Sequence, residues 1–194
     1  MKQGKLSRNR YFLTDDDMKR FLVYILFLLP SAIFAQEYSD WEIWNAGKYS
    51  AFTSLLYVNN RFYCAFREAS AHRAFLDKND TMGEIVLISS SDGIRWEICA
   101  RLQEAKCDLR DPKLSLTPDG RLMLLYCRRT YGKISGTPTT FVTFFDLESQ
   151  KMLPPLPITI TGYDKQYKWL WEVVWHKGEA YGFMYGNYCF CVNF

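Results

Sequence analysis

Apolar residues after position 35 fall into short runs that are rich in aromatic and β-branched side chains and that end in turn-forming residues. No stretch keeps the helical period of about 3.6 residues, so the pattern predicts an all-β protein. Three hairpins share one plan, in which a polar turn joins two apolar runs. They occupy residues 52–66, 113–126 and 171–185, and their turns recur about every 60 residues. The sequence therefore repeats one strand-rich unit.

A further hairpin lies between successive repeats, at residues 84–101 and 141–160. Two hairpins per repeat make four strands, which is the content of one propeller blade. We predict a β-propeller of four-stranded antiparallel blades. A β-sandwich is the alternative, but its strands would not recur at so regular an interval. Residues 36–194 hold about two and a half blades, whereas roughly 4–8 close a propeller. We therefore expect a truncated propeller, the N-terminal part of a larger protein, which is inactive by itself.

The N-terminal residues have the pattern of an export signal. Residues 18–20 are basic after Met18, residues 21–29 are apolar without interruption, and small residues end the segment at Ala35. We predict a signal peptide over 18–35, cleaved after Ala35, and a protein secreted to the periplasm or the cell exterior. A retained membrane anchor is the alternative, although the run is shorter than the roughly 20 residues that span a bilayer. Residues 1–17 are expected to be disordered or to precede the true start.

Charge and cysteine content exclude some classes of partner. The chain has 24 Lys and Arg against 21 Asp and Glu, but the excess comes from residues 1–35, so the remainder is balanced. Nucleic acids need a basic surface and are therefore excluded as partners. The six cysteines allow several disulfide pairings, among which the sequence does not choose. Cys64 and Cys127 lie in apolar runs, which favours buried thiols. No cysteine spacing is typical of a metal site, so we expect no metal and no cofactor.

Polar residues gather at one end of the predicted blades. In a propeller, the loops between strands two and three and the connections between blades open on one face. Here those segments carry arginine, carboxylate and histidine side chains, and such convergence is typical of a ligand site. Arginines from three separate connections could clamp one carboxylate. The substrate-binding candidates are Arg67, Glu68, His72, Arg110 and Arg128, and the catalytic candidates are Asp77, Asp111 and Glu172, with Asp80 in the same loop as Asp77.

These candidates have structural alternatives. The arginines could instead pair with neighbours such as Glu68 and Asp111. Asp111 stands before Pro112 and could simply fix a turn. A glycosidase needs a carboxyl group that delivers a proton to the leaving oxygen, and we rank Asp111 first for this role.

The hairpin at 84–101 contains a turn with a signature of its own. Ser90 and Asp92 can bond the turn backbone, Gly93 can take a positive φ, and Trp96 can pack beneath the hairpin. We expect these four residues to be structural. An ordinary Asp-Gly hairpin is the alternative, but the turn closely resembles the Asp-box of the sialidase-like (BNR-repeat) β-propellers.

Four segments look like an exported branch of the sialidase superfamily, whose members are exo-α-sialidases. They are residues 51–56, 66–72, 109–114 and 169–176, in the order of the family. The resemblance implies a six-bladed propeller that hydrolyses a terminal acidic sugar. It also implies an arginine triad for the sugar carboxylate, an aspartate acid/base and a tyrosine nucleophile paired with glutamate. Residues 51–53 depart from the family pattern, because Ala-Phe-Thr stands where typical members have Arg-Ile-Pro.

Taken together, the sequence predicts an exported glycoside hydrolase of sialidase type that cleaves terminal acidic sugars from glycans. The alternative is a non-catalytic propeller that binds carbohydrate or another partner, which the missing first-strand arginine favours. We expect a glycan partner, no nucleic acid, and no membrane span once the signal is removed.

Overall fold

The computed structural model describes residues 14–20, 39–73, 82–130, 138–159 and 169–184, together with the backbone of 188–192. The chain divides into two units, Met1–Trp41 and Glu42–Phe194. In the first unit, residues 15–20 form a short helix, and Thr14 caps it by accepting a hydrogen bond from the Asp17 amide at 3.3 Å. No described helix is long and apolar enough to cross a membrane. Residues 21–35, most of the predicted signal peptide, lie outside the described residues.

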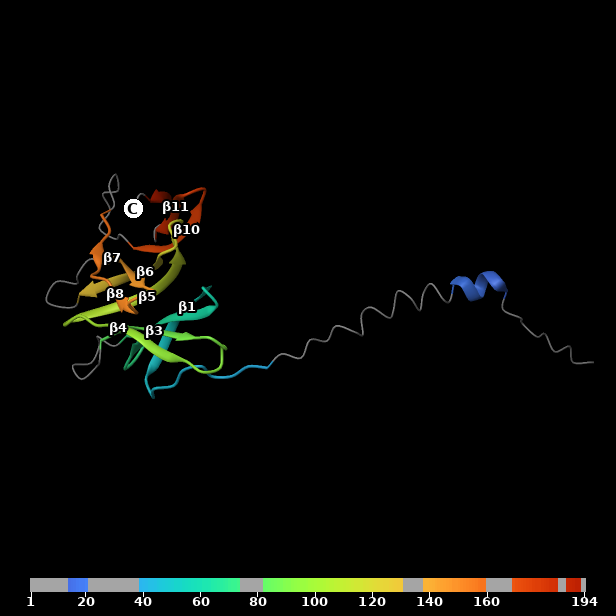
Figure 1. Cartoon of the computed structure of the whole chain (residues 1–194), viewed down its shortest axis with the longest axis horizontal. Helices are drawn as coiled ribbons and strands as arrows, with labels where there is room; N and C mark the ends of the chain where they lie inside the picture. The colour runs from blue at the N-terminus through green and yellow to red at the C-terminus, as the bar shows by residue number, and fades with distance from the viewer. Residues whose placement is uncertain are drawn as a thin grey trace, which may run out of the picture. The chain divides into compact units, whose positions relative to one another are not determined.

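The second unit consists of three successive antiparallel sheets (Figure 1). In the first and third sheets the strands are neighbours in chain order, and so are β5 to β8 of the second sheet, so each of these paths is a meander. The prediction of an all-β fold with four-stranded antiparallel blades is confirmed. The first sheet contains β1 (Tyr49–Val58), β2 (Arg61–Ala69), β3 (Glu84–Ser90) and β4 (Glu97–Leu102); the second contains β5 (Cys107–Leu116), β6 (Leu122–Thr130), β7 (Thr139–Asp146), β8 (Lys151–Met152) and β9 (Leu156–Pro157); the third contains β10 (Leu170–His176), β11 (Glu179–Met184) and β12 (Tyr188–Val192).

The outer edge of the second sheet differs from the predicted single strand. Both β8 and β9 pair with β7, and the residues between them are Leu153 and two prolines. Proline has no amide hydrogen and cannot donate to the ladder, so Pro154 and Pro155 interrupt the fourth strand. The strand is thereby split into two short pieces along one edge.

Two of the three repeated hairpins close with turns that match the twist of their strands. Asn59 and Asn60 have φ angles of 51° and 58°, and Lys177 and Gly178 have 51° and 84°. Two consecutive positive φ angles define the type I′ turn, which asparagine and glycine tolerate best. The polar turn residues of the sequence therefore set the register of these hairpins.

The three sheets pack face to face through apolar layers. Between the first two sheets the layer includes Ala65, Ile85, Leu87, Leu109 and Leu124. A second layer, with Leu125, Val142, Leu170 and Val173 among its members, lies between the second and third sheets. The first strands of these two sheets are in direct contact, because Ser54 of β1 accepts a hydrogen bond from the Leu114 amide of β5 at 2.9 Å. The sheets therefore follow one another as blades do.

The other face of the first sheet is covered by its own chain. Cys64, Phe66, Val86 and Ile88 form a cluster against which Ile43, Trp44 and Trp96 pack. Cys64 and Cys127 are buried free thiols, and burial raises the pKa of Cys64 to about 11. They act as small apolar side chains, as the sequence indicated.

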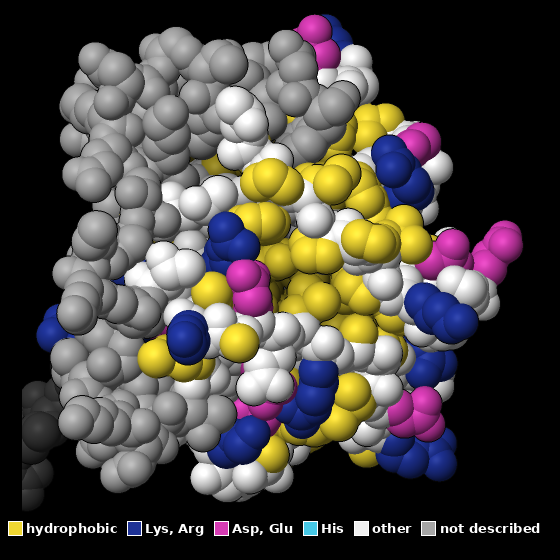
Figure 2. Space-filling view, turned by 90° about the vertical axis from the view of Figure 1, so that its left-hand side faces the viewer, with side chains coloured by type: hydrophobic (Ala, Val, Ile, Leu, Met, Phe, Trp, Pro, Cys, Tyr) yellow, Lys and Arg dark blue, Asp and Glu magenta, His cyan; other side chains and the backbone are white. Residues whose placement is uncertain are grey.

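Some apolar surface remains open. Leu55 and Tyr57 of β1 are 60% and 57% exposed, and Val174 and Phe183 of the third sheet are 63% and 65% exposed. Figure 2 shows one face of the molecule on which hydrophobic side chains gather between charged side chains of both signs.

Each first strand contains a bulge near its start. The register shifts between Ala51 and Ser54 in β1, between Arg110 and Lys113 in β5, and between Leu170 and Glu172 in β10. Inside these bulges Phe52 and Asp111 have φ angles of 61° and 50°. A bulge redirects a side chain that a regular strand would place on a sheet face. The three bulges therefore form one repeated structural feature at one end of the sheets.

The turn at residues 90–96 joins β3 to β4, at the opposite end of the strands. Asp92 Oδ1 accepts hydrogen bonds from the amides of Ile94 and Arg95 at 2.9 and 2.8 Å. Ser90 Oγ accepts one from the Gly93 amide at 2.9 Å, and Trp96 Nε1 donates to the Gly93 carbonyl at 3.0 Å. These four residues hold a turn at the place where the sequence predicted one.

This turn gives stability a dependence on pH. The amides of Arg95 and Ile94 lower the pKa of Asp92. A carboxyl group whose pKa is lowered by folding stabilises the fold above its unfolded pKa of about 3.9, and this contribution is lost as the pH falls toward the folded pKa. We expect Asp92→Asn to lower the urea midpoint at pH 7 and to have a smaller effect at pH 3. An equal decrease in the urea midpoint at pH 7 and at pH 3 would contradict this account.

Candidate functional site

A buried network of charged side chains lies where the first two sheets meet. The Asp108 carboxylate, at the start of β5, is fully buried. Its Oδ1 accepts a hydrogen bond from Arg67 Nε of β2 at 2.8 Å, and Arg67 Nη2 is 2.8 Å from the same oxygen. Its Oδ2 accepts from Arg110 Nε at 2.6 Å. One carboxylate therefore binds two guanidinium groups from different sheets, and we call Arg67, Asp108 and Arg110 the Asp108 network.

The Asp108 network also holds the chain that connects β2 to β3. Arg67 Nη1 donates to the Ala71 carbonyl at 3.2 Å, and Arg110 Nη2 donates to the His72 carbonyl at 2.5 Å. The Gly83 amide donates to Asp108 Oδ1 at 3.0 Å. Both ends of the connection are thus fixed to the same three side chains. Charge-assisted hydrogen bonds of this kind are stronger than neutral ones.

Asp111 lies in the bulge of β5, next to the Asp108 network. The residue is buried, with an exposed fraction of 5%. Its Oδ1 has no hydrogen-bond partner among the described residues. Burial raises the pKa of Asp111, against the opposing effect of the positive charges of Arg110, Lys113 and Arg67. A buried carboxyl group that keeps its proton more strongly than usual can serve as a general acid.

Aromatic side chains from the other two bulges border this region. Phe52 of β1 lies against the His72 ring, with ring centres 5.6 Å apart, and Tyr49 Oη is 3.1 Å from His72 Nδ1. In the third sheet, the Trp171 ring faces Lys113 Nζ of β5 at 5.2 Å. The bulges therefore bring an acid and aromatic surfaces to the same end of neighbouring strands. Such a combination is typical of small-molecule sites.

Glu68 does not join Arg67, because neighbouring residues of a strand point to opposite faces. It is buried on the far face of the first sheet, where it accepts hydrogen bonds from Trp44, Lys48 and Arg101 at 2.9, 3.2 and 2.9 Å. Lys48 and Arg101 also bind Glu84. Burial alone would raise the pKa of Glu68, but these hydrogen bonds outweigh it and lower the pKa. This cluster fixes the segment before β1 to the sheet.

Arg128 is likewise paired within the protein. Its Nη1 donates to Glu104 Oε1 at 2.9 Å, and its guanidinium lies 4.3 Å from the centre of the Phe141 ring. Glu172 is exposed on β10, one residue after Trp171. Asp77 and Asp80 lie outside the described residues. Of the predicted site residues, the structure brings together Arg67, Arg110, Asp111 and the His72 backbone.

Asp108, Gly83 and Lys113 were missed by the sequence analysis. Asp108 and Arg110 are two residues apart in one strand, which places them on one face, and this spacing was the available signal for Asp108. No such signal in the sequence points to Gly83, because its role depends on contacts with two other segments of the sheets. Among the described residues, no three histidine, cysteine or acidic side chains are grouped as metal ligands would be.

No family model matches the chain, and no curated protein matches it. Among solved structures, it is similar to the crystal structure of a thermostable family-43 glycoside hydrolase, with a TM-score of 0.47 and 16% sequence identity. The similarity covers 68% of this chain and 44% of that one, so the chain spans less than half the length of that structure. Membership of the sialidase superfamily stays a prediction.

The packing around the Asp108 network predicts a severe effect of Gly83→Ala. A Cβ at this position would overlap Asp108 Oδ1 and Arg67 Nε and would lie 2.8 Å from the Leu109 carbonyl oxygen. Separating a buried ion pair costs about 3–5 kcal/mol. We expect a loss of that size in the free energy of unfolding, measured by urea denaturation.

Gly120→Ala is the matched control. Gly120 has a φ of 83° but no atom within 4 Å of the added Cβ. Alanine at this position would be strained only in its backbone, which lowers the free energy of unfolding by about 1–2 kcal/mol. Equal losses for the two variants would show that Gly83 is not needed for the Asp108 network.

Proposed function

We propose that the protein is an exported glycoside hydrolase that cleaves terminal sugars from glycans, with Asp111 as the general acid. The observation that carries the proposal is the buried Asp111 carboxyl, with an oxygen that has no hydrogen-bond partner among the described residues. Glycoside cleavage requires a proton at the leaving oxygen, and a carboxyl group with a raised pKa supplies it. The bulge presents this group at the sheet end where polar residues gather.

The proposed reaction divides between a proton donor and groups that position it. Asp111 would give its proton to the glycosidic oxygen as the bond to the sugar breaks. Arg110, the residue before Asp111, is bonded through its side chain to Asp108 and to the His72 carbonyl, which would restrict the strand on that side of Asp111. Trp171, held beside Lys113, offers an apolar surface for a sugar ring. Glycosidases use a second carboxylate, and Glu172 and Asp77 are the candidates for that role.

The finer proposal is that the terminal sugar is acidic, as in exo-α-sialidases. The resemblance of the four segments supports it, and so does the positive charge of Arg110 and Lys113 near Asp111. Export through a signal peptide over residues 18–35 belongs to the same proposal, because glycans of this kind lie outside the cytoplasm.

A non-catalytic glycan-binding propeller is the second candidate. It is favoured by the pairing of the arginines within the protein, since Arg67 binds Asp108 and Arg128 binds Glu104. Arg67 is also fully buried and has no surface open to a ligand. A site without a free arginine clamp can still bind sugars through aromatic and amide contacts.

Turnover separates the two candidates. The protein at its natural length is incubated with sialylated glycans and with neutral glycans, and released monosaccharides are measured. We expect release from at least one substrate and a loss in kcat of at least about 100-fold for Asp111→Asn, because general acid catalysis contributes that much. Asparagine tolerates a positive φ and keeps the bulge.

Asp40→Asn is the control, because Asp40 is an exposed aspartate and precedes the unit that contains Asp111. It should leave kcat unchanged. If the wild-type protein binds glycans but releases no sugar, the non-catalytic candidate is correct.

A further inference from the structure

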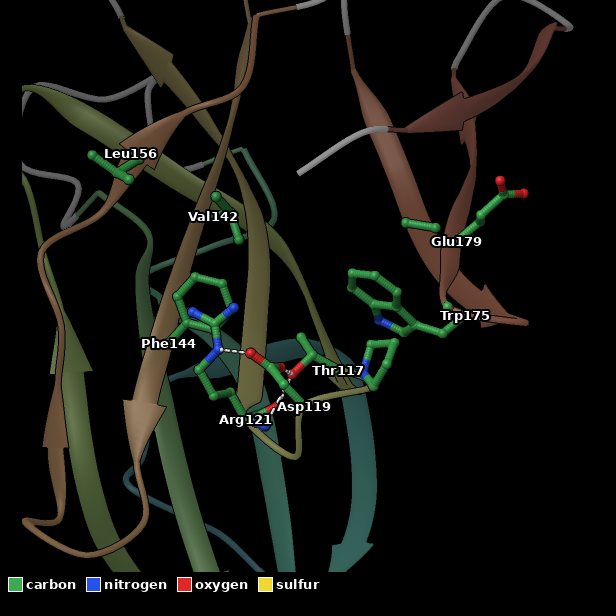
Figure 3. A pocket seen from close by; sticks show the side chains of 11 residues that line it. Thr117, Asp119, Arg121, Val142, Phe144, Leu156, Trp175 and Glu179 are labelled. Carbon is green, nitrogen blue, oxygen red and sulfur yellow. Dashed lines mark hydrogen bonds and ion pairs between the residues drawn. The ribbon is translucent and has the colours of Figure 1, made fainter.

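A cavity lies between the second and third sheets, at the end of the strands opposite Asp111 (Figure 3). Its volume is about 520 Å³, within the range of roughly 300–1,000 Å³ for small-molecule sites. The β5–β6 turn and β7 form one wall, and β10 with the start of β11 forms the other. From Asp111 in β5 to Thr117, the residue after the end of this strand, the chain advances six residues, which is roughly 20 Å. This cavity is therefore separate from the region around Asp111.

Two aromatic side chains from different sheets line the cavity. The Trp175 indole extends from β10 toward Thr117 and Val142 (Figure 3). Its Nε1 donates to Ser115 Oγ at 3.3 Å, which fixes the ring across the boundary between the sheets. On the other wall, Arg121 lies over Phe144 at 4.2 Å from the ring centre. An indole and a stacked guanidinium–phenyl pair thus provide two flat surfaces.

The polar side chains lie around these flat surfaces. Arg121 Nε donates to Asp119 Oδ2 at 2.7 Å, and the Thr117 hydroxyl donates to Asp119 Oδ1, so the turn is held by its own side chains. Glu179 lies on the β11 side and is exposed. Two carboxylates and one guanidinium give the lining one net negative charge. This charge opposes the binding of an acidic ligand.

We propose that this cavity binds a neutral sugar unit of a glycan chain. A sugar ring has C–H groups on its faces and hydroxyl groups around its edge, and it therefore matches an aromatic wall surrounded by planar polar groups. Adjacent hydroxyls can bond the two oxygens of one carboxylate or two nitrogens of one guanidinium. The site is independent of the Asp111 proposal, since it would hold a different part of a glycan from the terminal sugar.

The test measures binding at Trp175 directly. The full chain labelled with ¹⁵N is titrated with cellohexaose, xylohexaose, mannohexaose and maltohexaose, each up to about 10 mM. The indole N–H signal of Trp175 is identified by its absence in Trp175→Phe. We expect a saturable shift of this signal with at least one of the four sugars and a loss in affinity of at least tenfold for Trp175→Ala. We also expect a severalfold loss for Glu179→Ala, which alters an exposed side chain and leaves the fold intact.

Trp41→Phe is the matched control, because Trp41 is 57% exposed and precedes the unit that contains the cavity. It should bind as the wild type does. No shift of the Trp175 signal with any neutral sugar would overturn the proposal. So would stronger binding of sialyllactose than of all four neutral sugars. Because binding is measured without turnover, an inactive protein would leave this result unaffected.

Discussion

The structure depends on one buried carboxylate. Asp108 is inaccessible to water and binds guanidinium groups from two sheets, together with the Gly83 amide. Burying a charge is unfavourable unless other groups compensate for it, and removing one partner of such a pair costs about 3–5 kcal/mol. The two sheets meet through apolar side chains along most of their length. The Asp108 network fixes their relative position at the end where the apolar layer gives way to polar residues.

This arrangement has a consequence for Asp111. Both nearby arginines donate to Asp108, so they share their charge with a carboxylate that is not Asp111. The bulge turns Asp111 into a buried position where Oδ1 has no hydrogen-bond partner among the described residues. A buried polar group without a partner reduces stability, and such groups are found where function requires them. We infer that the fold is stabilised at Asp108 and that part of this stability is given up at Asp111.

Much of the fold could be predicted from local patterns. Alternating apolar runs, paired asparagines and the recurrence of hairpins identify strands, turns and the four-stranded repeat, because these depend on neighbouring residues. The split of the fourth strand at Pro154 and Pro155 was not predicted, although proline cannot donate to a strand ladder and the pair was an available signal. The pairing in the candidate site was harder to predict, since Arg67 and Asp108 are 41 residues apart and either arginine could have bound Asp111. Glu68 was grouped with Arg67 although the alternation of a strand separates them. The close contact of Gly83 with Asp108 and Arg67 forms only when three segments of the chain come together, so no local sequence pattern predicts it.

The most direct test of this account is the titration of the Asp111 carboxyl group, followed by ¹³C NMR in the full chain. The account predicts a pKa above the ordinary value of about 3.9, because burial outweighs the nearby positive charges. It also predicts that Asp108→Asn lowers the pKa of Asp111, since the two guanidinium charges are then no longer neutralised by a neighbouring carboxylate. A pKa at or below about 3.9 in the wild type would contradict the central claim, because Asp111 would then be an ordinary ionised side chain.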